Sequence, residues 1–298
     1  MTGFVEYPIE LRTGTPAQGS AGAFRCLRSR CLVGIVDSIW DIDIPDGDAA
    51  RTLTIKYAPS TSLVLLAQYR SPVHIRHRDR DLPTKCAIHI QAHAATLRPT
   101  GSLGVFIVCL RPDAVSQIVD ASLGEFADTS IHMKNLFSAG DVSACDDMLA
   151  GSRSSLERMA MVEAFLLRRL RPRADSLACH VAQSLRKDPT LQVESLASKL
   201  GFSARHLARS FNTTFGMGPK QFSRLARFER IMAERRNGLS WAEVACACGL
   251  SDQAHLVREF KAIVGERPTE FFAGELAFGA SGVGQPNFVV QRRMFTGS

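Results

Sequence analysis

The first half of the chain alternates short apolar runs with turn-forming residues. Between residues 31 and 110, Pro, Gly, Asp and Ser separate runs that are rich in Val, Ile and Leu: CLVGIV, RTLTIKY, SLVLLAQY, KCAIHI and LGVFIVCL. Runs of this kind are typical of β-strands in a small antiparallel sandwich or barrel. Arg111-Pro112 ends the last run, and Asp113 then predicts a short helix that continues to Asp120.

From residue 142 onward the apolar positions recur every three or four residues, which predicts helices. One such run ends at Arg171-Pro172, and the pattern then stays helical from about 175 to 273. We therefore expect an α+β protein. Its predicted parts are a β-rich regulatory or effector domain over 1–140, a helical connector over 141–174, an all-α domain over 175–275 and a flexible tail over 276–298. Within that tail, NFVVQRRMF fits either an added strand or a disordered end.

The helical part carries one arrangement twice. GFSARHLARSFNTTFGMGPKQF begins at Gly201 and GLSDQAHLVREFKAIVGERPTEF begins at Gly249. His-Leu, Arg-x-Phe and Gly-x-x-Pro-x-x-Phe recur 49 residues apart, whereas the glycines that open the two segments lie 48 apart. The second turn therefore contains one extra residue.

Each copy has the features of a helix-turn-helix. A glycine ends the first helix, Ser203 or Ser251 caps the second, and Leu and Phe four residues apart form the buried face. A helical bundle with coincidental Gly-Ser turns is the plain alternative, and the number of matched positions disfavours it. Between the copies, KQFSRLARFERIMAERR predicts one long helix that joins the modules. If both second helices enter successive major grooves, they lie about 34 Å apart.

The net charge of +7 is unevenly distributed. Residues 1–180 hold 20 basic and 19 acidic residues, whereas residues 201–236 hold eight basic and two acidic ones. Residues 237–275 hold three basic and six acidic residues. Because Lys and Arg bind phosphates, we expect the first module and the joining helix to supply most of the contacts to a DNA backbone.

The second helix of a helix-turn-helix presents its outward side chains to base edges in the major groove. Arg can pair with guanine and Gln with adenine, whereas Ala208 and Ala254 can offer only an apolar contact to a thymine methyl group. For His206 and His255, partial burial that seats the turn is a second interpretation. The predicted DNA-binding residues are Ser203, Arg205, His206, Arg209, Lys220, Arg224, Ser251, Gln253, His255, Arg258 and Lys261.

The double helix-turn-helix resembles the DNA-binding domain of AraC/XylS-type bacterial transcription regulators over about residues 175–273. YPIE near the start and LGVFIVCLRPDA resemble an N-terminal domain found in one branch of that family. The resemblance implies promoter binding and an N-terminal regulatory domain built as a small β-barrel with helices. Double-stranded promoter DNA is the expected partner. RNA polymerase, a small-molecule effector and a second copy of the chain are candidate partners that the sequence leaves open.

The N-terminal half contains other candidate chemistry. His89, Gln91 and His93 alternate as on one strand face, where two histidines can bind a metal, and His74, Arg76 and Arg78 can meet an anion. Both sets also fit a polar solvent-facing surface. Cys26 and Cys31 lie among Arg25, Arg28 and Arg30, which favours a reactive thiol, with structural burial as the alternative.

These features leave two rivals to a regulator: a metal- or thiol-dependent barrel enzyme or sensor that its C-terminal domain targets to DNA, and an architectural DNA-binding protein. No phosphate-binding loop, dinucleotide fingerprint or Gly-x-Ser-x-Gly elbow is present, so we predict no enzyme activity and no cofactor. The eight cysteines lack zinc-ribbon spacing, and no apolar run reaches the roughly 18 residues of a membrane helix. The start of the chain lacks a signal-peptide pattern, and we expect a cytoplasmic protein that does not enter a membrane.

Overall fold

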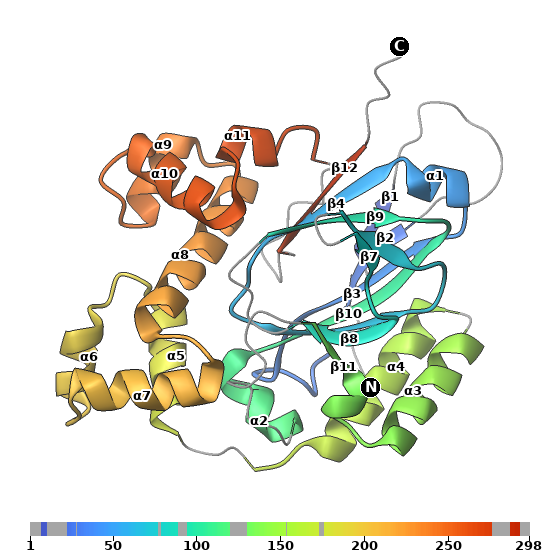
Figure 1. Cartoon of the computed structure of the whole chain (residues 1–298), viewed down its shortest axis with the longest axis horizontal. Helices are drawn as coiled ribbons and strands as arrows, with labels where there is room; N and C mark the ends of the chain where they lie inside the picture. The colour runs from blue at the N-terminus through green and yellow to red at the C-terminus, as the bar shows by residue number, and fades with distance from the viewer. Residues whose placement is uncertain are drawn as a thin grey trace.

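The computed structural model describes residues 7–10, 23–27, 29–76, 79–88, 94–119, 130–152, 154–172, 176–275 and 287–292. It consists of a β-rich N-terminal half and a helical C-terminal half that lie side by side (Figure 1). The strands are β1 (Tyr7–Glu10), β2 (Ala23–Leu27), β3 (Val36–Ile44), β4 (Leu53–Tyr57), β5 (Leu63–Gln68), β6 (Val73–Ile75), β7 (Arg80–Asp81), β8 (Lys85–Ile88), β9 (Ala95–Pro99), β10 (Leu103–Leu110), β11 (Ser130–His132) and β12 (Phe288–Arg292).

The helices of the N-terminal half are short until the connector begins. α1 follows the third strand, and a 3-10 turn and α2 follow β10 at the place where the sequence predicts a helix. The predicted helical connector is a pair of helices, α3 and α4, which Ser138 and Ser154 cap. The bounds are α1 (Gly47–Arg51), η2 (Pro112–Ala114), α2 (Val115–Ile118), η4 (Met133–Asn135), α3 (Ala139–Gly151) and α4 (Ser155–Arg169).

The strands form two antiparallel sheets. Sheet A has the order β1-β2-β3-β10-β5-β8-β11, and sheet B has the order β12-β4-β9-β6-β7. In each described sheet the two end strands are not paired with each other, so both sheets are open. The sandwich alternative is therefore present, and the closed barrel is not.

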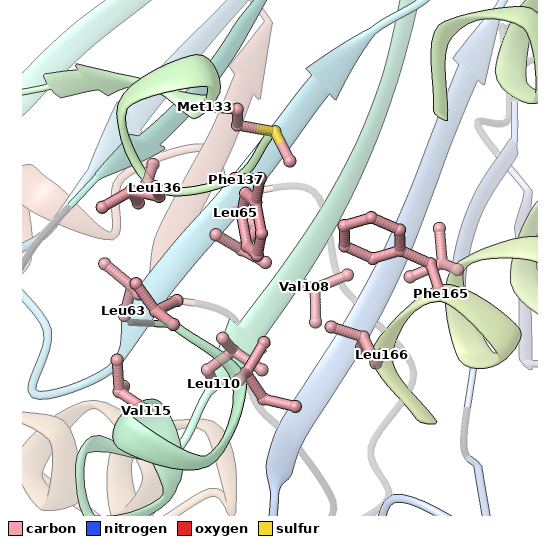
Figure 2. Packing of buried hydrophobic residues seen from close by; sticks show 14 of the residues in the cluster. Leu63, Leu65, Val108, Leu110, Val115, Met133, Leu136, Phe137, Phe165 and Leu166 are labelled. Carbon is pink, nitrogen blue, oxygen red and sulfur yellow. The ribbon is translucent and has the colours of Figure 1, made fainter. Parts of the chain in front are cut away.

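Alternate residues of β5 belong to different cores, which explains why its sequence is apolar throughout. Val64 and Leu66 face sheet B, where they pack with residues such as Ile55 and Leu97. Leu63 and Leu65 face the opposite side. There they pack against helices α2 and α4 and the segment around Met133 (Figure 2). Sheet A is thus buried on both faces, and sheet B closes the sandwich.

One predicted strand is in the wrong place. CLVGIV over 31–36 is mostly a turn, and the strand β3 begins only at Val36. β3 reads VDSIWDIDI. A charged residue, Asp41, stands at a fully buried position of this strand, so the apolar alternation that would identify the strand is broken. Since a buried carboxylate needs a partner, this strand becomes recognisable only when the partner is known.

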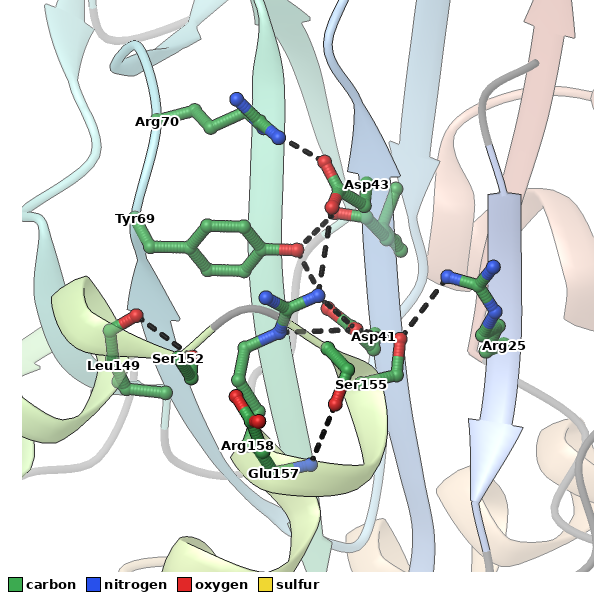
Figure 3. Close-up of polar contacts among 12 residues, drawn as sticks. Arg25, Asp41, Asp43, Tyr69, Arg70, Leu149, Ser152, Ser155, Glu157 and Arg158 are labelled. Carbon is green, nitrogen blue, oxygen red and sulfur yellow. Dashed lines mark hydrogen bonds and ion pairs between the residues drawn. The ribbon is translucent and has the colours of Figure 1, made fainter. Parts of the chain in front are cut away.

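That partner comes from the connector. Arg158 of α4 donates to Asp41 with Nη2–Oδ2 at 2.6 Å and Nε–Oδ2 at 3.1 Å, and the Tyr69 hydroxyl donates to Asp41 Oδ1 at 2.6 Å (Figure 3). Burial and then the neighbouring Asp41 charge raise the pKa of Tyr69 above its ordinary value. This network fastens α4 to sheet A.

The C-terminal half contains two small cores that one helix connects. The first module packs around Leu207, Phe211 and Phe215, and the second around Leu256 and Phe260. The helices are α5 (Leu177–Lys187), α6 (Val193–Lys199), α7 (Ala204–Phe215), α8 (Pro219–Arg236), α9 (Trp241–Ala247), α10 (Gln253–Val264) and α11 (Pro268–Phe271).

The chain returns to the N-terminal half after the last helix. β12 pairs antiparallel with β4, from Phe288 opposite Tyr57 to Arg292 opposite Leu53. The flexible tail predicted over 276–298 is therefore wrong for 288–292, where the added strand is present. Strand pairing across about 230 residues depends on tertiary contacts that a local pattern does not reveal.

Among the described residues, the helices are all too short or too polar to span a lipid bilayer.

Candidate DNA-binding surface and interdomain pocket

The first module has the geometry of a helix-turn-helix. α6 ends before Gly201, whose φ of 75° lies in the left-handed region that glycine tolerates. Ser203 then caps α7 by accepting a hydrogen bond from the His206 backbone N–H at 3.2 Å. Leu207 and Phe211 are fully buried beneath α7, so its opposite face is free to meet a ligand.

The second module repeats this geometry with one correction. Gly249, with φ of 68°, ends α9 as predicted. The residue that caps α10 is Asp252 rather than Ser251, and its Oδ1 accepts from the His255 N–H at 2.6 Å. The extra residue of the second turn lies before this cap, because Asp252 follows Ser203 at the repeat distance of 49. Ser251 instead donates to the Asp252 side chain at 3.0 Å.

α8 holds the two modules together. Phe222 and Leu225 in its first half belong to the core of the first module, whereas Phe228 and Met232 in its second half belong to the core of the second. The helix is continuous from Pro219 to Arg236, as the sequence predicts. The separation of α7 and α10 is therefore set by one regular helix.

The residues predicted to read bases lie on the outer faces of α7 and α10. Arg205, Arg209, Gln253 and Arg258 are all exposed. Within the described part of the chain, none of the three arginines forms an ion pair. Their charged groups are thus available to another molecule, and their contacts to DNA remain a prediction.

The two histidines of the repeat differ in their environment. His206 is exposed and stacks on the exposed Phe202, with ring centroids 5.1 Å apart, so the partial burial considered for it is absent. His255 is half-buried, and its Nδ1 lies 3.2 Å from the Ser251 hydroxyl. The structure therefore agrees with a role of His255 in seating the turn.

The predicted phosphate-binding residues are exposed, and two of them bind neighbouring carboxylates. Lys220 lies 2.7 Å from Glu194, and Arg224 lies 3.2 Å from Glu259 of α10. Exposed pairs of this kind are weak, so a phosphate can compete for the cations. Lys261 is exposed near the end of α10.

A cavity lies where the two sheets meet the helical half. Its volume is about 330 Å³, which is within the range of small-molecule sites. Its wall is mostly apolar and includes Ile55, Leu66, Leu97 and Ile107 from both sheets. The α8 residue Met232 closes it on the side of the second module. We call this cavity the interdomain pocket.

The polar groups at the rim of the interdomain pocket join the two halves. Arg186 of α5 donates to Asp37 at 2.7 Å. Glu229 of α8 accepts from the Ser60 hydroxyl at 3.0 Å, from the Thr61 N–H and hydroxyl at 2.8 Å each, and from Asn287 at 3.1 Å. The pattern of the sequence missed these residues because their partners lie far away in the chain.

The other candidate sites of the N-terminal half are only partly described. His89, Gln91, His93 and Arg78 lie outside the described residues. His74 contacts two carboxylates, Asp79 at 3.4 Å and Asp81 at 3.1 Å, which disfavours an anion at that position. Arg76 is exposed. Across the described ranges, no group of three His, Cys, Asp or Glu side chains is arranged to hold a metal ion.

The cysteines form no disulfide within the described residues. Cys26 is buried, which agrees with the structural interpretation of that thiol, whereas Cys31 is exposed. Burial raises the pKa of Cys86 and of Cys109 to about 12, so both remain thiols at neutral pH.

Comparison with known proteins agrees with the geometry of the helical half. Residues 196–274 match the family model of a helix-turn-helix domain. The match confirms the DNA-binding helix-turn-helix of the C-terminal region and its resemblance to AraC/XylS-type regulators. A comparison with curated proteins finds no match.

Solved structures of ToxT from Vibrio cholerae are similar to the chain at low identity. An apo ToxT variant from strain SCE256 has a TM-score of 0.46 at 11% identity and covers 78% of this chain and 95% of its own. Wild-type ToxT from the same strain, bound to an unsaturated fatty acid, has a TM-score of 0.44 at 10% identity and covers 78% and 93%.

Proposed function

We propose that the protein is a sequence-specific transcription regulator that binds promoter DNA with α7 and α10 in successive major grooves. The observation that carries the proposal is the exposure of Arg205, Arg209, Gln253 and Arg258 on the faces opposite two buried Leu/Phe cores. The recurrence of this arrangement 49 residues apart favours this function over a helical bundle with coincidental turns.

The bases are read by a small set of side chains. Arg209 and Arg258 hold the same position in the two copies, and a guanidinium can donate two hydrogen bonds to guanine O6 and N7. Lys220, Arg224 and Lys261 bind phosphates and set the strength of binding without setting the sequence.

The test begins with selection of bound sites from a random pool of duplex DNA by the full-length protein. Arg209→Ala and Arg258→Ala are then compared with wild type on the selected site. Each is expected to lose about 1–3 kcal/mol of binding free energy and to relax the sequence preference at one base step. Arg30→Ala, which removes an exposed arginine of the N-terminal half, is the matched control and should bind as wild type does.

Salt dependence separates base readers from phosphate binders. Lys220→Ala should weaken binding to selected and random DNA alike and reduce the slope of log affinity against log salt by about one. A regulator prefers its selected site, whereas an architectural protein binds selected and random DNA almost equally. Equal affinity of wild type and both arginine variants for the selected site contradicts the assignment of the reading face.

The interdomain pocket is the proposed effector site. Its wall is mostly apolar, and its rim contains Glu229 and Arg186, which belong to the DNA-binding half. A small apolar molecule in this space therefore contacts both halves at once. Mass spectrometry of co-purifying small molecules tests this assignment. Leu66→Trp fills the pocket, so a molecule that occupies it should co-purify with wild type but not with this variant.

A further inference from the structure

β12 belongs to both halves of the protein. Phe288 and Val290 join the core between the two sheets, whereas Val289, between them in sequence, joins the core of the second module. All three side chains are at most 4% exposed. Because successive side chains of a strand point to opposite faces, one short strand packs against the sandwich and the module simultaneously.

The polar contacts of β12, and of Asn287 directly before it, also reach both halves of the protein. The Asn287 carbonyl accepts from the Ala58 N–H of the sandwich at 2.7 Å, and its side-chain amide donates to Glu229 of α8. Arg236 at the end of α8 donates to the Phe288 carbonyl at 2.8 Å. Gln291 donates to the Phe271 carbonyl of α11 at 2.9 Å.

The same strand also completes the wall of the interdomain pocket. Asn287 and Phe288 line the cavity, and the Phe288 ring packs edge-on against Trp40 with centroids 5.7 Å apart. Both residues follow the DNA-binding domain in sequence. The pocket is thus incomplete until the chain has returned from the second module to β4.

We propose that β12 is a strap that couples occupancy of the interdomain pocket to docking of the second module. The proposal rests on the proposed function, in which the pocket receives an effector. A molecule in the interdomain pocket that packs against Phe288 favours the pairing of β12 with β4. The paired strand in turn packs Val289 against the second module. By thermodynamic reciprocity, a docked module also favours the closed pocket.

Two features of this region allow the coupling to be reversible. β12 is a five-residue edge strand, and short edge ladders open at lower free energy than the centre of a sheet. On the outer face of sheet B, Lys56 next to Val289 in the ladder binds Glu266 at 2.8 Å. Opening of β12 therefore removes the contacts of Val289 and Gln291 with the second module, whereas the Lys56–Glu266 pair, which belongs to β4, still holds the α10–α11 corner beside sheet B.

The test uses hydrogen exchange in the full chain and needs no effector. Phe288→Ala alters the pocket side of the strap, and we expect exchange of the α11 amides to increase at least about fivefold, the lower end of typical coupling. Val289→Asp alters the module side, and exchange in β4 should increase by a similar factor. Two variants serve as controls. Leu66→Ala removes a pocket side chain of sheet A that is not part of the strap, and Val33→Asp places the same new charge as Val289→Asp at a surface valine. Neither control should change the exchange of the α11 amides.

Val289→Ala replaces Val289→Asp if the latter does not fold, as judged by its circular dichroism and thermal unfolding. Unchanged α11 exchange in Phe288→Ala overturns the strap, and so does an equal increase in Leu66→Ala. These outcomes are separate from the function, because wild-type preference for a selected DNA site, and its loss in Arg209→Ala, do not depend on the strap. If that preference is absent while α11 loosens as expected, the regulator proposal fails and the mechanical coupling stands.

Discussion

The carboxylate of Glu229 gives the sharpest test of how the two halves are held together. It accepts four hydrogen bonds from three residues, two of them from Thr61, which is fully buried. In Glu229→Ala, the Thr61 N–H cannot rotate to a new partner, whereas the two hydroxyl groups and the side-chain amide of the half-buried Asn287 can. A buried donor without a partner costs about 1–3 kcal/mol, and entry of water from the adjacent pocket offsets part of that cost.

We therefore expect Glu229→Ala to lose about 1–3 kcal/mol of the free energy of unfolding. Glu229→Gln should lose less than half as much. Its oxygen can replace Oε1, and its amide group can donate to the Thr61 hydroxyl after that hydroxyl turns. The two variants differ mainly in whether the fixed Thr61 N–H keeps an acceptor, so their ranking tests the geometry directly.

The assay is urea unfolding followed by tryptophan fluorescence. Trp40 lies in the sandwich and Trp241 in the second module, so Trp40→Phe and Trp241→Phe backgrounds report on one half each. In Glu229→Ala we expect the two midpoints to move apart, because the rim contacts no longer link the halves. Equal losses in the Ala and Gln variants, or an Ala variant within about 0.5 kcal/mol of wild type, refute the reasoning.

Four further results are expected. Arg158→Ala leaves Asp41 buried without its cation and should cost about 3–5 kcal/mol in urea unfolding. Ser203→Ala removes the cap of α7 and should cost about 1 kcal/mol by the same assay. Hydrogen bonds from the His255 N–H and then from Ser251 lower the pKa of Asp252. The cap therefore contributes its full stability above the unfolded pKa of about 4 and loses it as the pH falls through the lower folded pKa. The difference in stability between wild type and Asp252→Asn should shrink over that range in acid titrations. Iodoacetamide at pH 8 should leave Cys109 unmodified in the native protein, as mass spectrometry of peptides can check.

The helical half was predictable because its signals are local. Gly201, Gly249 and the four-residue spacing of Leu and Phe specify turns and buried faces within a few residues of one another. The one error in this part, the cap at Ser251 instead of Asp252, came from an extra residue whose position in the turn the repeat leaves open. The base-reading side chains follow from the same periodicity and await the DNA-binding measurements.

The β-rich half was harder because its signals depend on distant partners. Most apolar runs are strands, yet β3 was missed because Asp41 interrupts its pattern, and Arg158 compensates that charge from a helix far along the chain. Open sheets and a closed barrel have the same alternation, so only strand pairing distinguishes them. In the sequence, the residues that line the interdomain pocket cannot be distinguished from other core residues, because the pocket exists only when both halves are assembled.

The sequence by itself determined the two helix-turn-helix modules, the continuous α8 and the outward placement of their arginines, because helices, turns and caps form from neighbouring residues. Only the tertiary structure decided where β12 pairs, what Glu229 binds and that a cavity separates the sheets from α8. Those features join residues that lie from 58 to more than 200 positions apart. Their stability comes from contacts that exist only after the chain has folded back on itself.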